Sequence, residues 1–226
     1  MRQKMQMLVG MASGFLLVVM IGVASADETP TSNPTLSDVE LAPAVVVAAG
    51  ADFVDLNAVS RLNSTVDGIA QNGTAFQLDD GRIASVAHAL VDARRATIGE
   101  DRSASIDLES VSISRLHDLA AIAADELPAG LTVATTPGEV GQVVALAGIP
   151  PNGRIEVITG EVIARTPGVG YGIGRPDVYV IAATVEPGWS GGPVVDAQGK
   201  VIAIIVGVEQ RTGVTLAVPI EYLPTP

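Results

Sequence analysis

Short runs of β-branched and apolar residues dominate the second half of this chain, and turn-forming residues separate them. Gly, Pro, Asn and Asp lie between the runs. Short strands that follow one another at regular spacing are typical of a β-barrel or a β-sandwich. The pattern predicts strands at residues 105–113, 142–148, 155–163, 178–185, 201–208 and 214–218.

The segment Gly188-Trp189-Ser190-Gly191-Gly192-Pro193 places a serine in a glycine frame. This frame leaves the serine hydroxyl and the neighbouring backbone N–H groups uncrowded, as a nucleophilic serine requires. A turn between two strands with an incidental serine is the alternative. A serine nucleophile also needs an imidazole base, which in turn needs an orienting carboxylate.

Two histidines, His88 and His117, are the candidates for that base. His88 follows a strand-like run at residues 73–78 and a turn at 79–81, and its apolar setting can fix an imidazole. Asp118 opens an apolar run, where an orienting carboxylate would be buried. His117 is its immediate neighbour and would face the opposite side of an extended segment, so we interpret it as a surface loop residue. The histidines lack the i, i+4 spacing of a helical metal site, so neither a metal nor another cofactor is predicted.

These segments resemble those of the trypsin-like (chymotrypsin-fold) serine peptidases, especially the bacterial HtrA-like branch without its peptide-binding PDZ domain. The resemblance extends over about residues 66–223. It implies an all-β fold of two six-stranded antiparallel β-barrels, with the active site in the cleft between them. It also implies that His88 is the general base, Asp118 its orienting carboxylate and Ser190 the nucleophile. The N–H groups of Gly188 and Ser190 would form the oxyanion hole.

The resemblance implies a serine endopeptidase that forms an acyl-enzyme with protein or peptide substrates. In this family the residue six positions before the nucleophile lines the floor of the primary specificity pocket. Here that residue is the uncharged Thr184. A buried lysine or arginine of a substrate would lack a partner there, so we expect cleavage after small or apolar residues. The other expected pocket residues are Val206, Gly207, Val208 and Leu216.

Trp189 departs from the family pattern, in which Asp or Asn precedes the nucleophile. An indole cannot form the ion pair with a newly cut N-terminal amine that orders the oxyanion hole of animal digestive relatives. It either packs beneath the loop as a structural peg or holds the loop in an inactive turn. The alternative function is therefore a catalytically silent two-barrel binding or scaffold protein.

Two other hydrolase folds fit the serine segment less well. The nucleophile elbow of α/β-hydrolases runs directly into a helix and precedes its histidine. Here residues 191–193 break a helix, and no histidine follows Ser190. Subtilisin-like enzymes place Asp before His and need helices that this pattern does not indicate.

The N-terminal residues have the pattern of a secretory signal. Arg2 and Lys4 precede an apolar stretch at residues 7–23, which ends in Ala24-Ser25-Ala26. This predicts a signal peptide at residues 1–26, with a membrane anchor at residues 7–26 as the alternative. Either places the protease part outside the cytoplasm, as a secreted, periplasmic or cell-envelope protein. The remaining expected parts are a flexible acidic linker at 27–48 and a protease domain at 49–226, with barrels at about 49–127 and 131–223.

The charge of the chain bears on its partners. Without residues 1–26 the chain has 11 basic and 25 acidic residues, a formal net charge of −14. Such a surface repels nucleic acid and anionic lipid headgroups, so no nucleic-acid partner is predicted. The chain contains no cysteine, so packing and strand pairing must stabilise it without disulfides.

Overall fold

The computed structural model describes residues 52–99, 104–123, 130–171 and 177–226. These residues belong to one compact unit. The expected signal peptide and linker lie outside them, as does most of the expected boundary between the barrels at residues 127–130. No helix in the described ranges is long and apolar enough to cross a bilayer.

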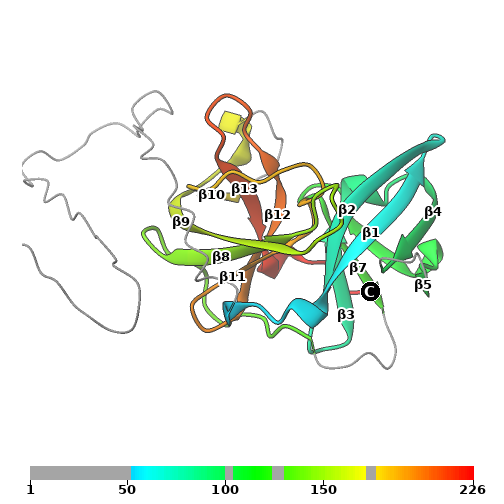
Figure 1. The fold of residues 1–226 in the computed structure, drawn as a ribbon, viewed down its shortest axis with the longest axis horizontal. Coiled ribbons are helices and arrows are strands. Elements are labelled where there is room, and N and C mark those ends of the chain that lie inside the picture. Colours follow the sequence, from blue (N-terminus) through cyan, green and yellow to red (C-terminus); the bar gives the residue numbers. More distant parts are fainter. Residues whose placement is uncertain (1–51, 100–103, 124–129, 172–176) are drawn as a thin grey trace, which may run out of the picture. The chain divides into compact units, whose positions relative to one another are not determined.

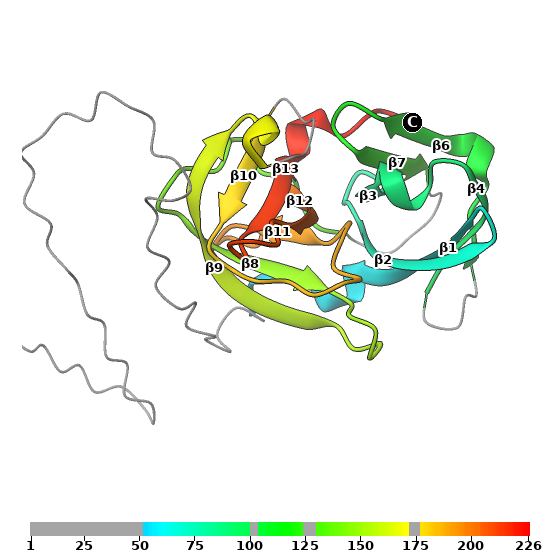
Figure 2. The same cartoon turned by 90° about the horizontal axis from the view of Figure 1, so that it is seen from above.

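The N-terminal half of the described chain forms a curled antiparallel sheet (Figure 1, Figure 2). Its strand order is β5-β4-β1-β2-β3-β7-β6. The first hairpin turns at Asp67-Gly68, where the φ angles are 50° and 80°. Asp-Gly suits such a two-residue turn, whose twist matches that of the paired strands. The strands are β1 (Val59–Val66), β2 (Ile69–Gln77), β3 (Arg82–Val86), β4 (Ala93–Ile98), β5 (Ala104–Ser105), β6 (Val111–Ser114) and β7 (Leu119–Ala123).

The C-terminal half forms a closed barrel with the order β10-β13-β12-β11-β8-β9. Every strand pair of the barrel is antiparallel. The barrel strands are β8 (Val143–Gly148), β9 (Glu156–Thr166), β10 (Val178–Ile181), β11 (Pro193–Val195), β12 (Val201–Val208) and β13 (Thr215–Pro219). The described 3₁₀ helices are η3 (Leu56–Ala58), η4 (Ala87–Ala89), η5 (Leu108–Ser110), η6 (Gly168–Tyr171) and η7 (Ile220–Tyr222).

Strand β12 is covered on both faces, which ties the barrel to the N-terminal sheet. Ile204 and Val206 pack in the larger core cluster, which also contains Phe76 of β2. Ile205 packs in the second cluster, with Tyr179 of β10. The first six residues of β12 are all buried. A strand buried on both faces appears as a continuous apolar run rather than an alternating one.

The all-β fold of two barrel-like sheets is confirmed, and the strand predicted at residues 201–208 coincides with β12. The strand predicted at 105–113 is interrupted, because Asp107 caps η5 by accepting the Glu109 N–H at 3.1 Å. The N-terminal sheet has seven described strands, without a pairing that closes it, where a closed barrel of six was expected. The short edge strand β5 accounts for the larger number. Strand β1 was not predicted, because buried polar residues such as Asn63 and Ser64 interrupt its apolar pattern.

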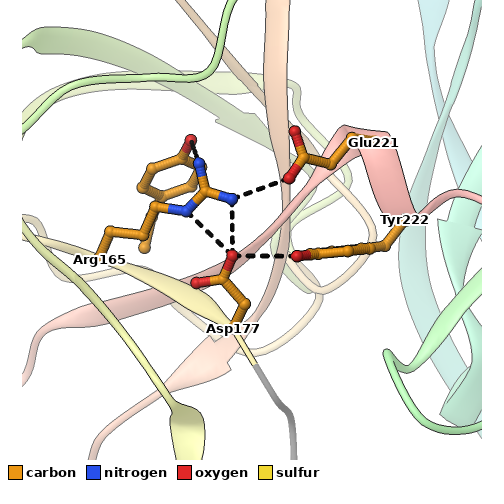
Figure 3. Close-up of polar contacts among 5 residues, drawn as sticks. Arg165, Asp177, Glu221 and Tyr222 are labelled. Atoms are coloured by element: carbon orange, nitrogen blue, oxygen red, sulfur yellow. Dashed lines mark hydrogen bonds and ion pairs between the residues drawn. The ribbon is translucent and has the colours of Figure 1, made fainter.

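A cluster of ion pairs and hydrogen bonds holds η7 against the barrel (Figure 3). Arg165 of β9 places Nη2 2.6 Å from Asp177 Oδ2 and 2.8 Å from Glu221 Oε1. The Tyr222 hydroxyl donates to Asp177 Oδ2 at 3.2 Å, and Arg165 Nη1 donates to the Tyr179 hydroxyl at 3.2 Å. The hydrogen bond to Asp177 raises the pKa of Arg165 above its ordinary value. One guanidinium therefore joins β9, the residue before β10 and η7.

We expect Arg165→Met to lower the free energy of unfolding by about 1 kcal/mol and Tm by about 2–4 °C. The substitution leaves Asp177 and Glu221 without their shared cation. Solvent screening limits the effect, because the Arg165 and Glu221 side chains are 28% and 45% exposed. Thermal unfolding at low and high salt measures the change, with Arg94→Met, at an exposed position of β4, as the control. Equal stability of the two variants would contradict the expectation.

Candidate active site

The pairing of β3 with β7 brings His88 and Asp118 together. Val86 pairs with Leu119, so the residues that follow β3 meet the residue that precedes β7. The Ala87 N–H donates to the Asp118 carbonyl oxygen at 3.0 Å. Asp118 has a φ angle of 59°, a left-handed conformation in which Asp is found more often than most residues. The backbone thus turns the Asp118 side chain toward η4, which contains His88.

The Asp118 carboxylate contacts His88 at two points. Its Oδ1 accepts the backbone N–H of His88 at 2.8 Å, and its Oδ2 lies 2.7 Å from His88 Nδ1. An ionised carboxylate only accepts hydrogen bonds, so Nδ1 carries the proton and Nε2 of the neutral ring keeps its lone pair. The Asp118 side chain is 9% exposed and that of His88 is 46% exposed. The imidazole is therefore held on its buried edge and remains accessible to solvent.

Ser190 lies in the loop between β10 and β11, where glycines permit a tight turn. Gly188 and Gly191 have φ angles of 95° and 91°. A Cβ atom at Gly191 would also collide with the Thr74 carbonyl oxygen and the Ser85 hydroxyl. Glycine at position 191 thus serves both the left-handed conformation and the close approach of the loop to the N-terminal sheet.

The backbone hydrogen bonds of this loop leave two N–H groups free in the described part of the chain. The N–H groups of Trp189, Gly191 and Gly192 donate to the carbonyl oxygens of Glu186, Ile205 and Trp189, at 3.2, 2.8 and 2.9 Å respectively. No described residue accepts a hydrogen bond from the N–H of Gly188 or Ser190. Two donors without internal partners beside one serine hydroxyl can bind an anionic oxygen.

The Trp189 indole lies in the core of the C-terminal barrel. The residue is 2% exposed and packs in the barrel's core cluster. A Cβ atom on Gly148 would lie 2.6 Å from the indole Cε3, so glycine leaves the room that the ring occupies. Within the described ranges, the buried Trp189 Nε1 has no hydrogen-bond partner. This packing agrees with the structural peg, one of the two roles considered for Trp189.

The serine loop and the histidine segment meet where the two sheets join. The Thr74 N–H of β2 donates to the Ser190 carbonyl oxygen at 2.8 Å, and the Thr74 carbonyl accepts the Ser85 hydroxyl at 2.8 Å. Ser85 lies on β3, and His88 follows it by three residues in the 3₁₀ helix η4. Among the described contacts, none is a hydrogen bond between the Ser190 hydroxyl and the His88 ring. Such bonds are often long in free enzymes and tighten when substrate binds.

The expected specificity-pocket residues lie on adjoining segments of the barrel. Strand β12 pairs with β13, and the segment after β10 contacts the turn between them. That contact is the hydrogen bond from the Thr184 hydroxyl to the Gly213 carbonyl oxygen, at 2.8 Å. The accessible members of the group carry no charge. Thr184, Gly207 and Val208 are exposed or partly exposed, whereas Val206 and Leu216 are buried.

His117 is engaged away from Ser190. Its ring stacks on Tyr222, with ring centroids 4.3 Å apart and an interplanar angle of 4°. Its Nδ1 lies 3.0 Å from Ser114 Oγ. The residue is half-buried in the turn before β7, rather than free on a surface loop. The described residues contain no group of three or more His, Asp or Glu arranged to hold a metal ion.

The fold and these residues define a class: an all-β protein of two barrel-like sheets, with a His-Asp pair on one sheet and a glycine-framed serine on the other. The family of the trypsin-like peptidase domain matches residues 73–204, more than half of the sequence. The chain belongs to the trypsin-like peptidase family.

Relatives and solved structures agree with this family. The serine protease Rv3671c of Mycobacterium tuberculosis is 28% identical over 208 residues, which cover 87% of this chain and 48% of the relative. The chain thus spans about half the length of that relative. The crystal structure of the active form of Rv3671c protease has a TM-score of 0.66 at 22% identity, covering 87% of this chain and 90% of that one. The HtrA-type protease AlgW with tripeptide has a TM-score of 0.62 at 24% identity, covering 73% and 56%. Both structures share the fold.

Proposed function

We propose that this chain is a serine endopeptidase that uses Ser190 as nucleophile, His88 as general base and Asp118 as orienting carboxylate. The observation that carries this proposal is the two-point contact between Asp118 and His88. That contact holds the ring in the tautomer whose Nε2 accepts a proton. The serine endopeptidase class also follows from the family and from the curated relative.

The proposed reaction proceeds through an acyl-enzyme. Ser190 Oγ attacks the carbonyl carbon of the scissile peptide while His88 Nε2 takes the hydroxyl proton. The resulting tetrahedral intermediate collapses, the C–N bond breaks, and His88 returns the proton to the leaving amine. Water then attacks the ester in the same way, and its proton passes through His88 back to Ser190 Oγ. Asp118 stays ionised and stabilises the imidazolium that forms twice in the cycle.

The oxyanion hole of this proposal consists of the N–H groups of Gly188 and Ser190. They are the loop donors for which no acceptor is found among the described residues. Donors that are already oriented stabilise the charge that develops on the substrate oxygen without further reorganisation. Trp189, between them in the sequence, is buried in the barrel core. Its packing there supports a rigid serine loop.

The second candidate is a silent binding or scaffold protein with the same fold, and the observation that favours it is Trp189 next to the nucleophile. A fluorophosphonate probe separates the two functions, because only an activated serine reacts with it. We expect stoichiometric labelling of wild-type protein and none of Ser190→Ala. Unlabelled wild-type protein that remains folded would favour the silent binding protein.

We expect cleavage after Val, Ala or Leu, with selectivity of about 10 to 200-fold among them, because one methylene contributes little. Thr184, Gly207 and Val208 offer no negative charge to a substrate lysine or arginine. Digestion of a peptide library, read by mass spectrometry, measures the preference. Dominant cleavage after Lys or Arg would contradict it. In that case Glu186, an exposed carboxylate in the serine loop, becomes the candidate partner, and Glu186→Gln tests it.

The proposed setting is outside the cytoplasm, with protein or peptide substrates. The charge and apolar pattern of residues 1–26 supports export, with either cleavage after Ala26 or retention of residues 7–26 as a membrane tether. The parts proposed for the chain are this segment, the acidic linker at 27–48 and the two-barrel protease domain at 49–226. Cell fractionation and mass measurement of the full-length expressed protein distinguish cleavage from tethering.

A further inference from the structure

Thr74 contacts the serine loop from the opposite sheet. It lies on β2 and is fully buried. Its hydroxyl donates to the Gly188 carbonyl oxygen at 2.7 Å and accepts the Ile149 N–H at 2.9 Å. Its backbone N–H donates to the Ser190 carbonyl oxygen at 2.8 Å. One residue of the N-terminal sheet therefore binds the carbonyl groups of both residues whose N–H groups lack a partner among the described residues.

We propose that Thr74 is a positioning residue that holds the serine loop in its oxyanion-binding conformation. The proposal rests on the proposed function, in which the N–H groups of Gly188 and Ser190 bind the substrate oxygen. The two hydrogen bonds draw the carbonyl groups of these residues toward β2. Because the carbonyl and the N–H of a residue share its Cα atom, fixing the two carbonyl groups limits rotation of the backbone that also directs the Gly188 and Ser190 N–H groups toward the substrate oxygen.

The direction of the hydroxyl hydrogen is set by its neighbours. A threonine hydroxyl has one proton to donate. Because Thr74 Oγ1 accepts the Ile149 N–H, its proton is directed to the available acceptor, the Gly188 carbonyl oxygen. Ile149 directly follows β8 and is 2% exposed, so no solvent is at hand to replace the bond that its N–H donates to Thr74. The hydroxyl thus links β8, β2 and the serine loop.

The side-chain contact and the backbone contact of Thr74 have separable effects. The backbone N–H bond to Ser190 survives any substitution except proline. Thr74→Val replaces the hydroxyl by a methyl group. Of the two bonds from Thr74 to the serine loop, it removes only the one to Gly188. It also leaves the Ile149 N–H without its acceptor. The loop then keeps its anchor at Ser190 and loses the one at Gly188.

The test compares kcat and KM of Thr74→Val, Thr74→Ser and wild-type protein on a peptide amide substrate. We expect Thr74→Val to lower kcat by about 10²–10³-fold, the loss typical for one oxyanion donor, with KM changed less than about threefold. Thr74→Ser keeps the hydroxyl and should retain kcat within about tenfold of wild type. Thr97→Val is the matched control, because Thr97 is buried in the same sheet and its hydroxyl has no partner among the described residues. It should keep wild-type kcat.

Three results would overturn the positioning role: wild-type kcat in Thr74→Val, an equal loss in Thr97→Val, or no rescue by Thr74→Ser. If Thr74→Val does not fold, Thr74→Cys replaces it, because a thiol is a weaker donor of similar size. Its kcat should then lie below that of Thr74→Ser, and an equal kcat would count against the role. Folded wild-type protein that neither hydrolyses peptides nor reacts with the fluorophosphonate would instead overturn the proposed function, and the positioning role with it.

Discussion

Ser190→Ala is expected to abolish peptide hydrolysis, lowering kcat by about 10⁶-fold, while Tm stays within about 2 °C of wild type. The hydroxyl is the proposed nucleophile, and among the described residues it takes part in no hydrogen bond that the fold would lose. Steady-state hydrolysis and thermal unfolding of the same preparation measure both quantities. Ser105→Ala, on the exposed edge strand β5, is the control and should leave hydrolysis unchanged.

His88→Ala should cost about as much as Ser190→Ala, and the double variant should cost no more than either alone. The reason is that nucleophile and base act as a unit, so their losses do not add. A His88→Ala protein with wild-type activity would disprove the assignment of the base. Attention would then turn to His117, whose ring is stacked on Tyr222.

Asp118→Asn is expected to lower kcat by about 10⁴-fold with little change in KM. The His88 N–H requires an acceptor at the position of Oδ1, so the asparagine must place its carbonyl oxygen there. Its NH₂ group then occupies the position of Oδ2, which lies 2.7 Å from His88 Nδ1. Two donors cannot face each other, so Nδ1 becomes an acceptor and the proton moves to Nε2. The ring can then no longer take the proton of Ser190.

A matched control for this variant is Asp196→Asn. Asp196 is also a buried aspartate whose Oδ1 accepts backbone N–H groups, in this case those of Gln198 and Lys200 at 2.9 Å. An asparagine oxygen can accept the same two bonds, so its hydrolysis rate should match wild type. A loss below about tenfold in Asp118→Asn, or equal losses in the two variants, would refute the proposed orienting role.

The two-barrel fold could be predicted because the apolar runs in the sequence coincide with strands that are buried in the structure. Strand β12 is a run of buried residues bounded by turns, and it was found with its observed limits. Strand β1 was missed, because Asn63 and Ser64 are buried polar residues and resemble a loop in a linear pattern. The expected strand at 178–185 ends at Ile181, since Ala183 and Val185 are buried in the core without extending β10.

The residues of the candidate site that belong to sequence motifs could be predicted. His88, Asp118 and Ser190 belong to short segments whose composition signals chemistry. Thr74 lies in the strand-like run at 73–78, but nothing in that run indicates its proposed role, which depends on contacts to residues 75 and 114 positions away. The role of Trp189 stayed open for a similar reason: whether an indole points into a core or over a loop depends on the room left by Gly148, 41 positions earlier.

The contacts of the serine loop also determine when, during synthesis, the proposed active site can be complete. The loop is held by Thr74 from the first sheet, and its Gly191 N–H donates to Ile205, which follows it in the chain. A polypeptide made from its N-terminus contains the His88–Asp118 pair long before residue 205 has been added. A nascent chain therefore lacks the bond that fixes its serine loop, and under the proposed function the site stays incomplete until residue 205 has been added.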